Sequence, residues 1–146
     1  MTVRLAGPDD TESVIRLVSS LLVELGADPL PERASAAYDA LLGGSGFAML
    51  AEVSGSDAAV CTVSYVDAIR TLGRYAVIQE MYVASSLRGT GIGRELLEAA
   101  LAESVARGCA IVELGTPAHG ERQIRFYARS GFVSVGERLR WRPSVD

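Results

Sequence analysis

The sequence predicts an α+β fold with a mixed, mostly antiparallel sheet that contains one parallel strand–helix–strand crossover. Three observations support this class. Helical apolar patterns near the N-terminus are followed by three runs rich in β-branched and aromatic residues, separated by turn residues. A glycine-rich loop and a long helix follow the third run. Another apolar run comes after that helix, and a crossover of this kind is right-handed as a rule.

The N-terminal part predicts one short strand and two helices. Residues 2–5 form the strand, which Gly7-Pro8-Asp9-Asp10 breaks while offering capping side chains to a helix. Between residues 14 and 25, apolar residues recur at helical spacing and make one face, and Gly26 closes that helix. A second helix starts at Pro29 and Pro31 and ends in a glycine-rich segment at residues 43–46.

The middle of the chain predicts three antiparallel strands at residues 47–53, 59–67 and 75–83. Ser54-Gly55-Ser56-Asp57 joins the first two strands and is a hairpin turn by composition. Thr71-Leu72-Gly73-Arg74 turns the chain into the third strand.

The C-terminal part alternates helices and strands. Strong helix formers predict a long helix from about Glu95 to Arg107, which Gly108 ends. The remaining expected elements are a buried strand at residues 110–114, a short helix at residues 120–130, and a last strand pair at residues 133–135 and 138–141 around Gly136.

Composition limits the classes of protein that fit the chain. Hydrophobic residues make up 49% and charged residues 22% of 146 residues, which predicts one globular domain over residues 1–146. The net charge of −4 argues against nucleic acid or an anionic membrane as the main partner. No apolar run reaches membrane-spanning length, and the N-terminus lacks the order of a signal peptide. Cys61 and Cys109 are expected to be reduced core residues of a cytoplasmic protein, and no Cys-x-x-Cys or His pair indicates a metal site.

The loop Arg88-Gly-Thr-Gly-Ile-Gly93 joins the third antiparallel strand to the long helix. Glycines let a ligand approach the backbone, because no Cβ stands in the way. The start of the helix directs free N–H groups and the positive end of its dipole at the same place. With Arg88 and Arg94 at its flanks, the loop is expected to bind an anion, phosphates in particular. A glycine-rich turn that only connects strand to helix is the alternative, and glycine spacing alone does not decide between the two.

Two other phosphate motifs fit the loop less well. A P-loop requires a lysine before Ser or Thr, and this loop has none. A dinucleotide fingerprint requires Gly-x-Gly-x-x-Gly, whereas Gly89, Gly91 and Gly93 are spaced by two throughout. Glu113 lies roughly 20 residues further on, where a ribose-binding acid belongs, so a dinucleotide-binding domain stays open as an alternative.

The loop resembles the Arg/Gln-x-x-Gly-x-Gly/Ala signature of the GNAT superfamily of N-acetyltransferases. Met81-Tyr82-Val83 precedes it, and Phe126-Tyr127-Ala128-Arg129-Ser130-Gly131-Phe132 is similar to the second motif of that family. The resemblance is close over residues 75–133. It implies a GNAT-like sheet with helices on both faces and a splayed pair of parallel strands, and the acyl-carrying arm of coenzyme A enters the gap between those strands.

The resemblance also implies which residues bind acetyl-CoA as a cosubstrate: Met81, Tyr82, Val83, Arg88, Gly89, Thr90, Gly91, Ile92, Gly93 and Arg94. A backbone N–H near residues 81–83 would hold the oxyanion, because the family has a strand bulge there. The chain departs from the family pattern at Gly120, where a cofactor-contacting Asn is common, at Gln123, where Ala is common, and at Ser85, where Pro is common.

Transfer of an acetyl group from a thioester to an amine requires that the amine lose a proton. Glu80 is the candidate base. With the period of a strand it shares a side with Ile78 and Tyr82, and apolar surroundings suit a carboxylate base. In GNAT proteins an acid near this position often deprotonates the amine through water. A strand-end glutamate that pairs with an arginine or faces solvent is the alternative.

Tyr127 matches the family tyrosine that donates a proton or a hydrogen bond to the departing thiolate. Its alternative is an amphipathic aromatic residue packed at a helix edge. Candidates for acceptor choice, each with a packing or surface alternative, are Leu30, Tyr38, Arg138, Arg140 and Trp141.

The sequence thus predicts an N-acetyltransferase that uses acetyl-CoA and acetylates a primary amine by direct attack in a ternary complex. The acceptor would be an amine-bearing small molecule or a peptide, and its identity is left open. A non-catalytic acyl-CoA sensor on the same fold, which would keep Arg88 to Gly93 but lack a base, is the second hypothesis. A homodimer is a further expectation, because GNAT proteins often dimerise.

Overall fold

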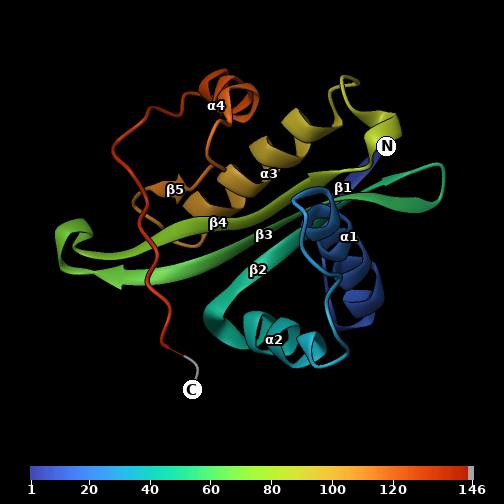
Figure 1. Ribbon diagram of the computed structural model, residues 1–146, viewed down its shortest axis with the longest axis horizontal. Coiled ribbons are helices and arrows are strands. Elements are labelled where there is room, and N and C mark those ends of the chain that lie inside the picture. The colour runs from blue at the N-terminus through green and yellow to red at the C-terminus, as the bar shows by residue number, and fades with distance from the viewer. Residues whose placement is uncertain (145–146) are drawn as a thin grey trace. The chain divides into compact units, whose positions relative to one another are not determined.

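The computed structural model describes residues 1–144 and contains one five-stranded sheet in the order β1-β2-β3-β4-β5 (Figure 1). The strands are β1 (Thr2–Leu5), β2 (Gly46–Val53), β3 (Ser56–Ala68), β4 (Gly73–Val83) and β5 (Val112–Leu114). The α-helices of the described residues are α1 (Thr11–Glu24), α2 (Ala34–Ala40), α3 (Ile92–Ala106) and α4 (Glu121–Ala128). Neighbouring strands are antiparallel from β1 to β4, whereas β4 and β5 are parallel. The predicted α+β class is therefore confirmed.

The described chain forms two compact units, residues 1–114 and residues 115–144. The first unit contains the whole sheet together with α1, α2 and α3. Within it, α1 and α2 lie on one face of the sheet and α3 lies on the other (Figure 1), so helices cover both faces as expected. The second unit contains α4 and the C-terminal segment.

The first helix forms where the apolar spacing predicts it. Val14, Leu17 and Val18 of α1 are buried, at the i, i+3, i+4 spacing of one helical face. Gly26 follows the end of the helix with a φ of 84°, a left-handed conformation that glycine adopts without a steric penalty. The second helix, α2, begins at Ala34, after the two prolines rather than at them.

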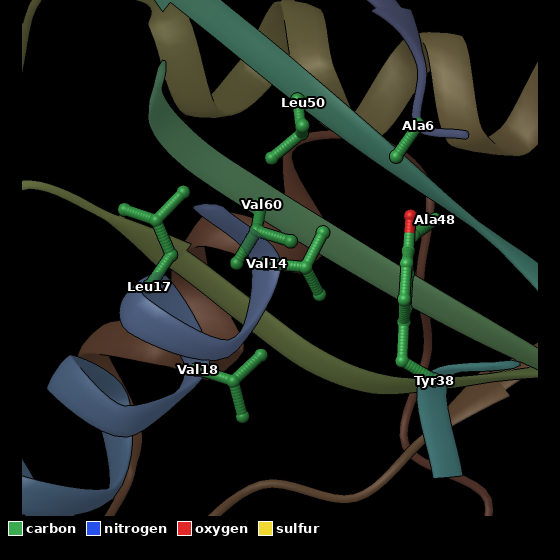
Figure 2. Close-up of a cluster of buried hydrophobic side chains, with 8 residues drawn as sticks. All are labelled: Ala6, Val14, Leu17, Val18, Tyr38, Ala48, Leu50 and Val60. Carbon is green, nitrogen blue, oxygen red and sulfur yellow. The ribbon is translucent and has the colours of Figure 1, made fainter. Parts of the chain in front are cut away.

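A buried cluster joins α1 and α2 to the sheet (Figure 2). Tyr38 reaches from α2 into this cluster, and its hydroxyl donates a hydrogen bond of 2.7 Å to the Gly7 carbonyl. Burial raises the pKa of Tyr38 to about 12. Tyr38, an expected candidate for acceptor choice, is therefore a core residue. The buried members of the cluster are Ala6, Val14, Leu17, Val18, Tyr38, Ala48, Leu50 and Val60.

A charged cluster holds the chain where it enters α1. The Asp10 carboxylate accepts hydrogen bonds from Arg4 Nη1 and Nη2 at 2.8 and 2.9 Å, and from the Gly7 N–H at 2.8 Å. The hydrogen bonds from Arg4 hold the pKa of the Asp10 carboxyl below its usual value of 3.8. The ionised form of Asp10 is therefore the form that stabilises the fold.

Asp10→Asn is expected to lower the free energy of unfolding at neutral pH by about 1–2 kcal/mol, a modest figure because Arg4 is partly exposed. Since folding lowers the pKa of Asp10, its contribution is present above the usual value of 3.8 and is lost as the pH falls through the folded-state value. Urea unfolding across acid pH should therefore show the wild-type and variant stabilities converging. Asp9→Asn, at the exposed neighbouring position, is the control, and parallel stability curves for Asp10→Asn would contradict this role.

The first hairpin turn is tighter than its composition suggests. Only Ser54 and Gly55 connect β2 to β3, with φ values of 52° and 80°. Two consecutive residues with positive φ form the two-residue turn whose twist matches that of the strands. Ser56 and Asp57 already belong to the β3 ladder, so the prediction of a turn over residues 54–57 was wrong at its second half.

The expected strand pair at residues 133–135 and 138–141 is absent from the described residues. Alternating apolar residues favour an extended backbone, but a strand also requires a hydrogen-bonded neighbour, and no ladder pairs this segment. Instead Arg138 lies against Gly115, where an added Cβ would stand 2.6 Å from Arg138 Nη1. The apolar side chains of the segment are exposed: Val133, Val135, Leu139 and Trp141.

Candidate active site

The parallel strands β4 and β5 pair over three residues, and β4 continues past the end of β5. Ala76, Val77 and Ile78 pair with residues of β5, and β5 ends at the last of these pairs. Residues 79–83 continue β4 past that point. Among the described residues, this part of β4 has a neighbouring strand only on its β3 side. The parallel pair that the resemblance implies is therefore present, and beyond it β4 has a free edge.

A β-bulge lies in β4 at the start of this unpaired edge. Thr62 of β3 pairs with Glu80, and the next residue, Val63, pairs with Ile78, so that Gln79 has no opposite residue. The bulge was expected near residues 81–83, and the structure places it earlier in the strand. A bulge residue changes the alternation of side chains, and so Glu80 shares a face with Tyr82 but not with Ile78.

The burial pattern agrees with this change of face. Val60, which pairs with Tyr82, belongs to the cluster under α1, and Tyr82 packs against the same cluster. Glu80 is opposite Thr62 and faces the α1 side as well. Ile78 pairs with Val63 and lies on the α3 side. The expectation that Ile78 flanks Glu80 was wrong, because the bulge turns that half of the strand over.

Glu80 is half-buried and is held by a hydroxyl group. Thr62 Oγ1 donates a hydrogen bond to Glu80 Oε2, and the Glu80 N–H donates one of 3.1 Å back to Thr62 Oγ1. Within the described chain, no hydrogen bond reaches Glu80 Oε1, and no arginine pairs with the carboxylate. One carboxylate oxygen is thus fixed while the other stays available to accept a proton.

The unpaired edge of β4 presents backbone donors. The Glu80 and Ala84 N–H groups point toward β3, where they bond to Thr62 Oγ1 and to the Ala58 carbonyl at 2.9 Å. Because successive peptide groups of a strand point to opposite edges, the N–H groups of Met81 and Val83 point toward the edge that β5 leaves free. These donors can hold an oxyanion or an amide-bearing ligand.

The glycine loop has the geometry of an anion cradle. Gly89 and Gly91 have φ values of 79° and 90°, and a Cβ added to either would meet no atom within 4 Å. Gly91 is the N-cap of α3, so the first-turn N–H groups have no intrahelical acceptor. Thr90 Oγ1 bonds to the Leu87 carbonyl at 2.5 Å and fixes the loop. The open space above glycines and free donors fits the phosphates of a coenzyme A derivative.

The two flanking arginines are both paired with carboxylates. Arg88 donates to Glu24 Oε2 at 2.5 Å and to the Val83 carbonyl at 3.0 Å, and its guanidinium lies 5.4 Å from the Tyr82 ring centre. The hydrogen bond from Arg88 lowers the pKa of Glu24. Arg94 pairs with Glu98 one turn further along α3, at 2.9 Å. Arg88 therefore connects the loop to the last turn of α1.

Gly91→Val is expected to weaken acetyl-CoA binding by roughly 10- to 100-fold, because the new side chain fills the space above the loop and displaces phosphate hydrogen bonds. The substitution also strains a left-handed residue. Gly108→Val is the matched control, since Gly108 follows the other end of α3 with a φ of 82° and equally open surroundings. Calorimetry that gives equal acetyl-CoA affinities for both variants would show that the loop is only a connector.

Tyr127 belongs to the second unit, in α4. It is half-buried, and its ring makes edge contacts with Phe126 and Phe132 at centroid distances of 5.0 and 5.5 Å. The turn before α4 explains the departure at Gly120. A Cβ at this position would lie 2.8 Å from the Pro117 carbonyl oxygen, so the local backbone does not accommodate an Asn.

Sequence reasoning missed two residues of the site, Thr62 and Glu24. Thr62 could have been noticed as the hydroxyl residue inside the apolar run from Ala58 to Val63 of β3. Glu24 carries no comparable signal, because its pairing with Arg88 joins residues that are far apart in the chain.

The structure gives less support to a dinucleotide site, a reactive cysteine or a metal site. The alternative ribose-binding acid, Glu113, pairs with Arg70 at 2.9 Å, and a sheet with one parallel pair is not a doubly wound dinucleotide fold. Both cysteines are unbridged, and burial raises the pKa of the Cys61 thiol to about 12. Within residues 1–144, no group of three or more His, Cys, Asp or Glu side chains could hold a metal ion.

A surface groove of about 600 Å³ lies away from Glu80, between α1 and the segment that precedes α2. Leu30, a candidate for acceptor choice, is part of its wall. The lining residues are Thr11, Glu12, Ile15, Arg16, Leu30, Pro31, Glu32 and Ser35.

Comparisons with known proteins agree with this geometry. The sequence model of the acetyltransferase (GNAT) family matches residues 16–132. A candidate acetyltransferase from Agrobacterium tumefaciens is 26% identical, with 98% of this chain and 100% of that chain covered and a TM-score of 0.83. An aminoglycoside acetyltransferase from an uncultured soil metagenomic sample has the same fold at 14% identity, with 99% and 96% covered and a TM-score of 0.83. The chain therefore belongs to the acetyltransferase (GNAT) family.

A similar sequence is that of an IAA acetyltransferase from Azospirillum brasilense, which is 36% identical over 69 residues. The alignment covers 47% of this chain and 45% of that relative, so it spans about half of the relative's length. In the part of the chain that the structure describes, no helix combines the length and the hydropathy that a membrane crossing requires.

Proposed function

We propose that this protein is an acetyl-CoA-dependent N-acetyltransferase that acetylates a primary amine by direct attack in a ternary complex. One observation supports the proposal: Glu80, a carboxylate with one fixed and one available oxygen, lies at the bulge of β4. Past this bulge β4 continues beyond the end of β5, and the chain then enters the glycine loop before α3. A proton acceptor and an anion site at opposite ends of one short segment suit an amine acceptor and a phosphate-bearing acyl donor.

Bound acetyl-CoA would supply an acetyl thioester, the activated acyl group of the reaction. The N–H groups from Gly89 to Arg94 would hold its phosphates, with Arg88 and Arg94 as added cations. The N–H groups of Met81 and Val83 would bind along the free edge of β4, and either could stabilise the carbonyl oxygen as it gains charge.

Two side chains would move protons. Glu80 Oε1 would accept a proton from the acceptor amine, directly or through one water molecule, and Tyr127 Oη would donate one to the departing sulfur. Direct attack is favoured because the alternative requires a thiolate nucleophile. Burial raises the pKa of both cysteine thiols, which keeps them protonated and unreactive at neutral pH.

An acceptor screen tests the proposal. Purified protein, acetyl-CoA and a panel of amines would be followed by detection of the released thiol, with product masses measured for every positive acceptor. The panel would contain small amines, aminoglycosides, lysine peptides and peptides with a free N-terminus. IAA would be assayed separately, because a relative that the chain matches over about half of its length is named an IAA acetyltransferase. Acceptor-dependent thiol release with an amide product would support the proposal.

The rival hypotheses give different results. A non-catalytic acyl-CoA sensor would bind acetyl-CoA in calorimetry but release no thiol with any acceptor. A dinucleotide-binding domain would bind NADH in preference to acetyl-CoA.

We also propose that the protein forms a homodimer and does not bind nucleic acid. Sedimentation at micromolar concentration would test the homodimer, and a binding titration with duplex DNA would test the second point.

A further inference from the structure

Thr62 is a buried hydroxyl in the apolar centre of β3. Its exposed fraction is 4%, and its neighbours Cys61 and Val63 are fully buried. Valine would have the same shape at this position and would carry no polar group into the interior. A hydroxyl in such surroundings is unfavourable unless it makes hydrogen bonds.

Both hydrogen bonds of the Thr62 hydroxyl group involve one residue, Glu80. Its Oγ1 donates to the Glu80 carboxylate and accepts from the Glu80 N–H. Two other buried hydroxyls among the described residues bond to backbone carbonyls: that of Ser104 donates to Ala100 of its own helix, and that of Tyr38 donates to Gly7. Thr62 therefore differs from both, because its hydroxyl donates to a carboxylate side chain, that of Glu80 on the neighbouring strand.

The bulge explains why a hydroxyl is needed at this position. An extra residue in one strand interrupts the ladder and leaves a backbone group without a regular carbonyl partner. Here the interruption falls between the pairs of Thr62 and Val63, and the Glu80 N–H at this point bonds to the Thr62 side chain. One threonine hydroxyl thus bonds both to the backbone N–H and to the carboxylate of Glu80 at the bulge.

We propose that Thr62 is a positioning residue that orients Glu80 for proton abstraction and stabilises its ionised form. This inference rests on the proposed function, in which Glu80 is the base. The effect of the Thr62 hydroxyl on the Glu80 carboxylate can, however, be measured without any reaction.

The titratable groups near Glu80 do not interfere with this measurement. The charge of Glu80 acts on Cys61, but burial raises the pKa of that thiol to about 12, so it stays protonated below pH 9. Arg88 donates a hydrogen bond to Glu24 and lowers the pKa of that carboxyl, which favours its ionised form. Tyr82, on the same face as Glu80, hydrogen bonds to Glu24.

The first test is a pH titration followed by ¹³C NMR of the carboxyl carbons in protein labelled at glutamate. Glu80→Gln is used to assign the Glu80 signal. Because a hydrogen bond donated to a carboxylate favours its ionised form, Thr62→Val is expected to raise the titration midpoint of that signal by about one pH unit. Thr62→Ser, which keeps the hydroxyl, should restore the wild-type midpoint. Ser104→Ala removes a buried hydroxyl that does not contact Glu80 and should leave the midpoint unchanged.

The kinetic test uses the best acceptor of the screen. Thr62→Val is expected to lower kcat by about 10-fold and to move the acidic limb of its pH profile upward, with the KM for acetyl-CoA unchanged. Thr62→Ser should stay close to wild type. A purely structural threonine would lower thermal stability without moving either the limb or the NMR midpoint.

The outcomes separate the two proposals. An unchanged Glu80 midpoint in Thr62→Val overturns the positioning role, whether or not the protein acetylates anything. A shifted Glu80 midpoint in a protein that releases no thiol with any amine would support the interaction between Thr62 and Glu80. It would contradict the proposed acetyltransferase function instead. A shift in Thr62→Val that Thr62→Ser fails to restore would assign the effect to packing and would also overturn the positioning role.

Discussion

Glu80→Gln is expected to lower turnover at neutral pH by about 10²–10⁴-fold, the range for loss of a positioned proton acceptor. The amide keeps the shape of the side chain and can still accept the hydrogen bond from Thr62, so the bulge should stay intact. Part of the lost rate should return at high pH, where more of the acceptor amine is already neutral. Acetyl-CoA affinity should change little, because the glycine loop is untouched.

The measurement is a pH–rate profile with the acceptor that the screen identifies. Glu113→Gln is the matched control, since it changes another half-buried strand glutamate whose partner is Arg70. An unchanged profile in Glu80→Gln would place the base elsewhere in the protein.

Tyr127→Phe is expected to lower kcat by a similar 10²–10⁴-fold while acetyl-CoA affinity stays close to wild type. The substitution keeps the ring and its contacts with Phe126 and Phe132, and it removes only the hydroxyl that would protonate the departing sulfur. Single-turnover kinetics and calorimetry would separate the chemical step from binding. Tyr75→Phe, which removes a hydroxyl from the ring under Arg70, is the control.

Wild-type turnover in Tyr127→Phe would end the proton-donor hypothesis for this residue. The double variant of Tyr127→Phe and Glu80→Gln is informative as well. If both groups act on one transition state, its defect should be smaller than the product of the two single defects.

The elements of the sheet could be predicted because their signals are local. Apolar spacing predicted α1, β-branched runs predicted β2 to β4, and the glycine-rich loop predicted the start of α3. The order of a strand, a helix and a further apolar run predicted the parallel pair of β4 and β5. Each of these features depends on residues that are close together in the sequence.

The errors have a common physical cause, which is the role of partners that lie far away in the chain. The position of the bulge depends on the register between β3 and β4, and a period-two pattern cannot reveal it. Residues 133–141 have the composition of strands, but a ladder partner is a property of the whole fold. For the same reason the sequence showed Glu80 as a candidate base without showing the hydroxyl that holds it.

The bulge also determines where the length of β4 can change. On either side of Gln79 the ladder is regular, and the pairs of Ile78 and Glu80 oppose consecutive residues of β3. Deletion of Gln79 would therefore close the strand into a continuous ladder with the faces of both halves preserved. Deletion of any other residue of β4 would either move the bulge or turn one half of the strand over, exchanging the side chains under α1 for those under α3. Insertions and deletions among homologous proteins should for this reason concentrate at this one position of the strand.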